Sequence, residues 1–328
     1  MSRFPPTRLP RSSRHRPSGR STVTAWLLAT ILVGCAVRAP ERSTRSSEPS
    51  PTSPSSEPTE LTNEALLIAL GGRLQVTTVD GSLVEVDGPD PPIVDVSAGG
   101  GRVLAIDARS QAWLGESTTG EPWSWSAVSL PKAPRNEPPL VAISPTGTTL
   151  ALLVGRAQGS SFDLELVELG SGDRRSITVE RGLDGPPIWL GPSVVAVHVI
   201  RDRGDSGFVL IDLPTEVATD VFSTGVTLGA SGDGASIAID EETSGDVLVG
   251  ERSNWREDGL GLLTRIRGPS GAGVDGLALS AAGDRLAIVR RTDVDATVEI
   301  IVRAGEGWRS FRTIAIPVGA RVSLAWQR

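Results

Sequence analysis

The chain has 328 residues, of which 39% are apolar and 22% are charged, so it is long enough to bury the core of one or two folded domains. It carries 39 acidic and 32 basic residues, and this net charge of −7 argues against nucleic acid and anionic lipid surfaces as electrostatic partners. A single cysteine excludes an intramolecular disulfide.

Residues 1–34 have the composition of a secretory signal peptide. Six arginines and no acidic residue lie in the first twenty positions, and an apolar run follows at Val23–Val33. If helical, this run covers only about half of the hydrocarbon core of a membrane. It therefore predicts an export signal rather than a stable transmembrane helix.

The apolar run ends in Leu32-Val33-Gly34-Cys35. This tetrapeptide resembles the lipobox of bacterial lipoproteins, in which the cysteine thiol receives a diacylglycerol and becomes the mature N-terminus. The resemblance implies a lipid on Cys35 that holds the protein on the extracytoplasmic face of the cell membrane. An ordinary signal sequence or an uncleaved anchor, with an incidental cysteine, is the alternative.

Residues 35–62 are rich in Ser, Pro, Thr and Glu and contain almost no large apolar side chain. Such a segment cannot bury enough apolar surface to offset the entropy of ordering, so we expect a disordered tether. Removal of residues 1–34 leaves 26 basic and 39 acidic residues, a net charge of −13, which strengthens the argument against nucleic acid. The folded domain is expected over residues 63–328.

One short pattern recurs through this domain. Three stretches read Ser-x-x-Gly-x-x-(Leu/Ile)-Ala, and they begin at Ser144, Ser231 and Ser280. Each places apolar runs on both sides of a turn in which the glycine can adopt positive φ. We expect a fourth copy at Ser97, with its apolar pair displaced by one residue.

The repeated unit has the length of a propeller blade. Apolar runs that open successive units start at residues 93, 140, 187, 226 and 274, which are 39 to 48 residues apart. Each unit holds four short apolar or alternating runs separated by Gly, Pro, Asp and Ser, with no convincing amphipathic helix. Four strands per unit at this period predict β-propeller blades.

The two ends of the domain complement each other. Val322–Trp326 has the pattern of a first strand with nothing after it, and Leu66–Leu70 that of a second strand with no first strand before it. Joining them makes one blade and removes the open sheet edges. The sequence thus predicts an all-β, six-bladed β-propeller of four-stranded antiparallel blades, closed by pairing the C-terminal strand with the N-terminal blade.

The Ser-x-x-Gly turn resembles the Ser-Pro-Asp-Gly turn of TolB-like (WD40-like) propeller repeats, which are also found in actinobacterial lipoproteins of the LpqB type. The resemblance covers residues 63–328 as a repeat pattern and implies the propeller architecture. Two turns, at Ser144 and Ser280, lack the Asp of that pattern, and Gly191-Pro192-Ser193 stands in the fourth unit instead.

Candidate chemistry is sparse. His198 is the only histidine after residue 34 and lies in an apolar run, where a structural role is expected over a catalytic one. With one histidine, no tyrosine and no thiol besides Cys35, we expect no catalytic residue, no metal site of the His-rich kind and no bound cofactor. Sialidase-like chemistry is disfavoured because it uses a tyrosine nucleophile.

We expect structural roles for the acidic groups and for most of the tryptophans. We expect solvated blade turns for three acidic groups, with calcium binding at one of them as the alternative. These groups are Asp202 with Asp205, Asp240-Glu241-Glu242, and Asp293 with Asp295. Most tryptophans are expected between blades, while Trp123 and Trp125 could mark an exposed contact surface.

Two functions of different classes remain. The first is a non-enzymatic lipoprotein, bound to the membrane through Cys35, whose propeller binds an envelope protein or another ligand. The second is a hydrolase or a receptor for a small ligand or glycan that uses Asp, Glu and Arg at a mouth of the central channel. Acids and arginines clustered at one mouth favour the second, and a channel lined by Ser, Thr and aliphatic side chains favours the first.

Overall fold

The computed structural model describes residues 64–78, 81–90, 92–116, 122–130, 140–155, 161–179, 185–200, 206–223, 225–241, 244–256, 259–260 and 263–327. Cys35, the signal peptide (1–34) and the tether (35–62) lie outside the described residues, as do Asp202, Asp205 and Glu242. The chain divides into two compact units, and all described residues belong to the second, Glu57–Arg328. Within them, no helix is long and apolar enough to cross a membrane.

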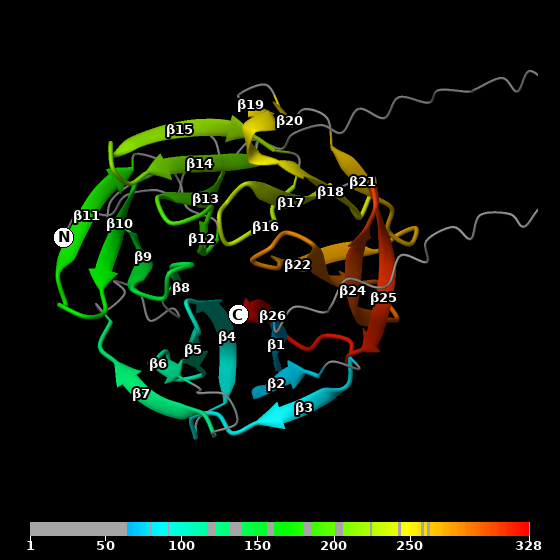
Figure 1. Cartoon of the computed structure of the whole chain (residues 1–328), viewed down its shortest axis with the longest axis horizontal. Coiled ribbons are helices and arrows are strands. Elements are labelled where there is room, and N and C mark those ends of the chain that lie inside the picture. Colours follow the sequence, from blue (N-terminus) through cyan, green and yellow to red (C-terminus); the bar gives the residue numbers. More distant parts are fainter. Residues whose placement is uncertain are drawn as a thin grey trace, which may run out of the picture. The chain divides into compact units, whose positions relative to one another are not determined.

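Six four-stranded antiparallel sheets succeed one another around a ring (Figure 1). Blade 1 consists, from the inside outward, of β26 (Val322–Gln327), β1 (Ala65–Leu70), β2 (Arg73–Thr77) and β3 (Leu83–Val86). Blade 2 consists of β4 (Ile93–Gly99), β5 (Arg102–Asp107), β6 (Ala112–Glu116) and β7 (Ser124–Val128). Blade 3 consists of β8 (Leu140–Ile143), β9 (Thr149–Gly155), β10 (Phe162–Glu168) and β11 (Arg174–Val179).

The remaining three blades repeat this order. Blade 4 consists of β12 (Pro187–Trp189), β13 (Val194–Ile200), β14 (Ser206–Asp212) and β15 (Val217–Phe222). Blade 5 consists of β16 (Leu228–Ala230), β17 (Ser236–Glu241), β18 (Asp246–Glu251) and β21 (Thr264–Ile266), and adds the 3-10 turn η1 (Arg252–Asn254) and the hairpin β19 (Trp255–Arg256) and β20 (Gly259–Leu260). Blade 6 consists of β22 (Gly273–Leu279), β23 (Arg285–Arg291), β24 (Ala296–Ala304) and β25 (Gly307–Ala315).

The two ends of the domain close the ring within blade 1. Strand β26 pairs with β1 in an antiparallel register that runs from Leu70 opposite Val322 to Ala65 opposite Gln327. The first strand of this blade therefore comes from the C-terminal end and the other three from the start of the domain. The predicted fold and its closure are confirmed.

The apolar core is divided into six layers, one between each pair of adjacent blades. Strand β1 shows why its sequence is a continuous apolar run. Leu66 and Ile68 pack toward blade 6, whereas Leu67 and Ala69 pack toward blade 2, and all four are almost fully buried. A strand covered on both faces needs apolar residues at every position, so the usual alternation is lost.

Tryptophans join neighbouring blades. The indole N–H of Trp189 donates to the Ala142 carbonyl of the preceding blade at 3.2 Å, and that of Trp326 donates to Ala278 at 2.8 Å. Trp123 and Trp125 are half-buried, stack on each other with ring centroids 5.7 Å apart, and pack against the layer between blades 1 and 2. This pair therefore packs at the interface between blades 1 and 2.

The three Ser-x-x-Gly turns have the same hydrogen bonds. In each, the glycine N–H donates to the serine carbonyl, and the N–H five residues after the serine donates to its Oγ at 3.0–3.1 Å. The serines, Ser144, Ser231 and Ser280, are almost fully buried, so these bonds satisfy polar atoms that water cannot reach. A buried hydroxyl that holds the turn explains why serine recurs.

The fourth copy predicted at Ser97 is wrong. Ser97 lies within β4, opposite Leu104, and the chain turns instead at Gly100 and Gly101, whose φ angles are 56° and 76°. The Ser97 Oγ accepts the backbone N–H of Ile143 in blade 3 at 3.1 Å. This serine connects two blades and takes no part in a turn.

Gly100 and Gly101 offer a matched test of packing between blades 2 and 3. Both have positive φ, so alanine costs about 1–2 kcal/mol of strain at either position. A Cβ on Gly100 would lie 2.1 Å from the Thr146 carbonyl oxygen of blade 3, whereas one on Gly101 would meet nothing within 4 Å. We expect Gly100→Ala to lower the free energy of unfolding by about 1–3 kcal/mol more than Gly101→Ala in urea titrations. Equal losses would contradict this close approach.

Candidate functional site: the central channel and its charged mouth

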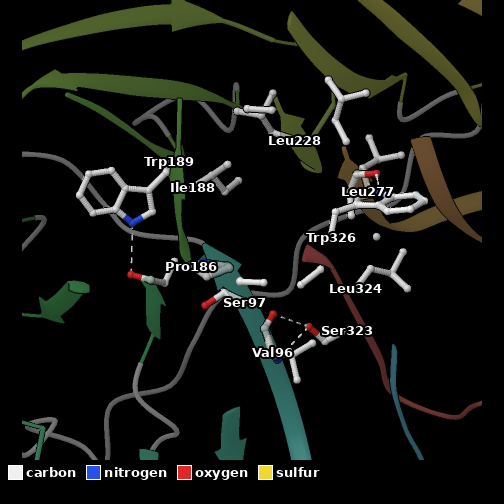
Figure 2. A pocket seen from close by; sticks show the side chains of 18 of the residues that line it. Val96, Ser97, Pro186, Ile188, Trp189, Leu228, Leu277, Ser323, Leu324 and Trp326 are labelled. Atoms are coloured by element: carbon white, nitrogen blue, oxygen red, sulfur yellow. Dashed lines mark hydrogen bonds between the residues drawn. The ribbon is translucent and has the colours of Figure 1, made fainter. Parts of the chain in front are cut away.

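The first strands of all six blades enclose a cavity of about 790 Å³ along the axis of the ring. Most of its wall is aliphatic or small. Figure 2 shows Ile188, Leu228, Leu277 and Leu324, from four different blades, around the same space. A cavity of this volume is within the range that holds small molecules.

The two mouths of this channel differ in charge. Neighbouring first strands run in the same direction. In blades 5 and 6, Thr227 contacts Val274 near the starts of β16 and β22, and Gly232 contacts Ala281 just beyond their ends. Their starts therefore gather at one mouth and their ends at the other. The starts bring together a set of charged lining residues that we call the charged mouth: Asp95, Asp275, Arg291 and Arg321. The opposite, neutral mouth is lined by small uncharged residues: Gly99, Gly100, Pro145, Ser231, Gly232 and Ala281.

An ion pair occupies one side of the charged mouth. Asp275 is the residue left out of the ladder where the register of β22 shifts between Val274 and Gly276. Arg291, at the end of β23, donates from Nε to the Asp275 carboxylate and from Nη2 to the Ala320 carbonyl at 2.8 Å. The bulge and the arginine together fix Asp275 at the mouth.

Asp95 is held by the neighbouring blade. Its Oδ1 accepts the Ser323 hydroxyl at 2.6 Å and the Val96 N–H at 3.0 Å. Burial raises the pKa of Asp95 above its ordinary value of 3.8, against the lowering effects of the Ser323 hydrogen bond, the Arg321 charge and the Val96 hydrogen bond. Ser323 and Asp95 are 228 residues apart in the sequence, so the closure of the ring creates this contact.

Arg321 is the remaining cation of the mouth. It is exposed, it precedes β26 and it lines the channel. Its charge acts on Asp95, yet within the described part of the chain its guanidinium makes no hydrogen bond and no ion pair. Arg321 and Asp95 thus place opposite charges near each other on the channel wall without forming a salt bridge.

The histidine and the acidic groups singled out from the sequence lie away from this mouth. His198 is buried in β13 and packs edge-on against Phe208, with ring centroids 5.3 Å apart, as the structural interpretation predicts. Asp293 and Asp295 are exposed in the turn between β23 and β24, as predicted. Asp240 corrects the prediction of a solvated turn, because it is buried within β17 and accepts the Thr227 N–H at 2.7 Å. No three His, Cys, Asp or Glu side chains of the described residues come together in a way that could hold a metal ion.

The residues of the charged mouth were not predicted from the sequence. Asp95 interrupts the apolar run of the first strand of blade 2, and Asp275 does so in blade 6. An acid in a strand that is otherwise apolar was the available signal, because the first strands of a propeller line its channel. The two acids and two arginines at this mouth are the feature expected of a hydrolase or small-ligand receptor. The channel wall of Ser, Thr and aliphatic residues is the feature expected of a scaffold.

The raised pKa of Asp95 predicts a stabilising substitution. Burial favours the protonated form in the folded state, so the ionised carboxylate costs stability at neutral pH. Asp95→Asn removes the charge and keeps an oxygen for Ser323 and Val96. In urea titrations we expect Asp95→Asn to be more stable than the wild type at pH 7. This advantage should shrink as the pH falls through the raised pKa and vanish below about pH 4. An advantage that is greatest in acid would contradict the assignment.

Comparison with known proteins supports the fold. No protein-family model matches the sequence, and no curated protein matches it. Among solved structures, TolB from Acinetobacter baumannii has a TM-score of 0.62 at 14% identity over 83% of this chain and 68% of that one. A putative TolB from Agrobacterium tumefaciens has a TM-score of 0.53 at 15% identity, over 79% of this chain and 97% of that one. A chain of a nidogen–laminin complex has a TM-score of 0.55 at 11% identity, over 80% and 98%. The chain therefore has a TolB-like six-bladed propeller fold.

Proposed function

We propose that the protein is a lipid-anchored, extracytoplasmic protein whose propeller is a non-enzymatic scaffold for a protein partner in the cell envelope. The observation that carries this proposal is a closed ring with two chemically different mouths, built on the fold of TolB. One of the matched chains comes from a complex between two proteins, nidogen and laminin, which supports a role in protein interaction.

The point at which the chain enters the ring suits a tethered scaffold. Strand β1 begins at Ala65, opposite Gln327, where β26 ends at the neutral mouth. The chain therefore enters the propeller at this end. The charged mouth lies at the opposite end of the ring, where a bound partner would not compete with the point of attachment.

The engagement of the two mouth acids supports a non-enzymatic role. Acid–base hydrolysis by two carboxylates needs one free to donate a proton and one free to attack or activate water. Asp275 is bound by Arg291, and one oxygen of Asp95 is bound by Ser323 and Val96. Asp275 is therefore not a free member of such a pair, and Asp95 alone does not make one.

A retention experiment tests the scaffold. The purified chain is immobilised and exposed to detergent-solubilised envelope, and the purified chain is also assayed against glycosides, esters and peptides. We expect specific retention of an envelope protein and no turnover. Turnover that persists through purification and disappears in Asp95→Asn or Asp275→Asn would overturn the proposal. Failure of the immobilised chain to retain any envelope protein would also overturn it.

Lipid attachment is tested at Cys35. Because the chain has no other thiol, Cys35→Ala should abolish the incorporation of radiolabelled palmitate in a bacterial host and release the protein from the membrane fraction. His15→Ala, a substitution outside the lipobox tetrapeptide, should leave the label unchanged. Label retained by Cys35→Ala would exclude the lipobox assignment.

A further inference from the structure

Two charged groups of opposite sign remain available at the charged mouth. Arg321 has no hydrogen-bond or ion-pair partner among the described residues, and only one oxygen of Asp95 is engaged. The two belong to neighbouring blades, and their groups lie close enough to interact by charge without forming a salt bridge. Asp275 and Arg291 neutralise each other.

The channel inside this mouth is lined mainly by aliphatic and small side chains, and the hydroxyls of Ser97, Thr227 and Ser323 on its wall are engaged in hydrogen bonds within the protein. Ile188, Leu228, Leu277 and Leu324 surround the space (Figure 2), and the indole N–H of Trp326 is used by the Ala278 carbonyl. The wall therefore offers a bound ligand few free polar partners, and it favours a ligand with an apolar body that loses water readily. A ligand of this channel should carry its charges at one end and apolar groups at the other.

We propose that the charged mouth binds a small apolar zwitterion, namely an amino acid or short peptide with aliphatic side chains. Its carboxylate is bound by the Arg321 guanidinium, its ammonium group by the free oxygen of Asp95, and its side chains enter the channel. This site goes beyond the scaffold function and does not depend on it.

The charge distribution disfavours the other simple ligand classes. A phosphate or another dianion would face the carboxylates of Asp95 and Asp275, and a cation without an acid would face Arg321 and Arg291. A neutral sugar would find few free hydrogen-bond partners on this wall, because the Ser97, Thr227 and Ser323 hydroxyls are already bound within the protein. A zwitterion places each charge against its opposite and removes apolar surface from water.

Isothermal titration calorimetry on the purified full chain tests this site. The probes are L-leucine, Leu-Leu, N-acetyl-Leu-Leu, which lacks the ammonium group, Leu-Leu amide, which lacks the carboxylate, and Gly-Gly, which lacks the apolar body. We expect L-leucine or Leu-Leu to bind, and each modified probe to bind at least about 10-fold more weakly than Leu-Leu if the peptide is preferred. The tighter of the two unmodified probes shows whether the channel takes a free amino acid or a peptide.

Variants assign the two charges. Arg321→Gln and Asp95→Asn should each weaken binding of the preferred probe about 10-fold. Asp95→Asn is expected to be stable at neutral pH, so its loss of binding cannot be ascribed to unfolding. Arg309→Gln, which changes an exposed arginine on the outer strand β25, is the matched control and should leave binding unchanged.

The proposal is overturned if neither L-leucine nor Leu-Leu binds at millimolar concentration. It is also overturned if blocking either charged group has no effect, or if Arg321→Gln binds like the wild type. None of these results affects the retention of an envelope protein, so failure of the ligand site and failure of the scaffold function are distinguishable.

Discussion

A chain that ends at Val318 is expected to lose the cooperative folding of the whole propeller, although it lacks only ten residues. The deletion removes β26 and with it the complete pairing to β1. Leu324 and Trp326 leave the layer between blades 6 and 1, and Ala325 leaves the layer between blades 1 and 2. A large apolar side chain contributes about 1.5–3 kcal/mol when fully buried, and a smaller share when partly buried like Leu324 and Trp326, while a whole domain is stable by only about 5–15 kcal/mol.

The measurement is urea unfolding followed by circular dichroism, for the truncated and complete chains. A milder variant separates the loss of one contact from the loss of the strand. Ser323→Ala removes the hydroxyl that links β26 to Asp95 and Val96, and should cost about 1–3 kcal/mol while folding remains cooperative. Superimposable unfolding curves for the truncated and complete chains would mean that the ring is closed without β26.

Phe208→Ala is expected to lower the free energy of unfolding by about 3–5 kcal/mol. The Phe208 ring is fully buried in the layer between blades 4 and 5 and packs edge-on against Trp255 at a centroid distance of 5.6 Å. It also packs against His198. Removal of the ring leaves a cavity between two rigid sheets, which cannot move together without disturbing their other neighbours.

Phe311 on the outer strand β25 provides the matched control. It is 45% exposed, so Phe311→Ala makes the same chemical change with little loss of packing, and should cost less than about 1 kcal/mol. Urea titrations of both variants check the difference. Similar losses for the two substitutions would contradict the division of the core into layers between blades.

The blade pattern could be predicted because it is local. Ser144, Ser231 and Ser280 each close a turn with bonds to residues at most five positions away, so the signal lies within one short stretch. The closing blade could also be predicted, since strands without partners at the two ends imply each other. Ser97 was misassigned because it also precedes a glycine turn. Its hydroxyl, however, accepts the Ile143 N–H of the next blade rather than an N–H of its own turn.

The charged mouth could not be predicted in the same way. Asp95 meets Ser323 only because the ring closes, and Asp275 reaches the mouth through a register shift in β22 that no turn signal marks. Asp240 was expected in a solvated turn, but it lies inside a buried strand, where it holds the loop before β16. The positions of these acids depend on contacts between blades, which the repeat alone does not encode.

The most direct test of the scaffold proposal is photo-crosslinking in the producing cell. A crosslinking amino acid replaces Thr227 at the charged mouth, Ala281 at the neutral mouth, or Arg309 on an outer strand. We expect one discrete protein adduct from one of the two mouths and none from Arg309. Absence of an adduct at both mouths would contradict the scaffold proposal.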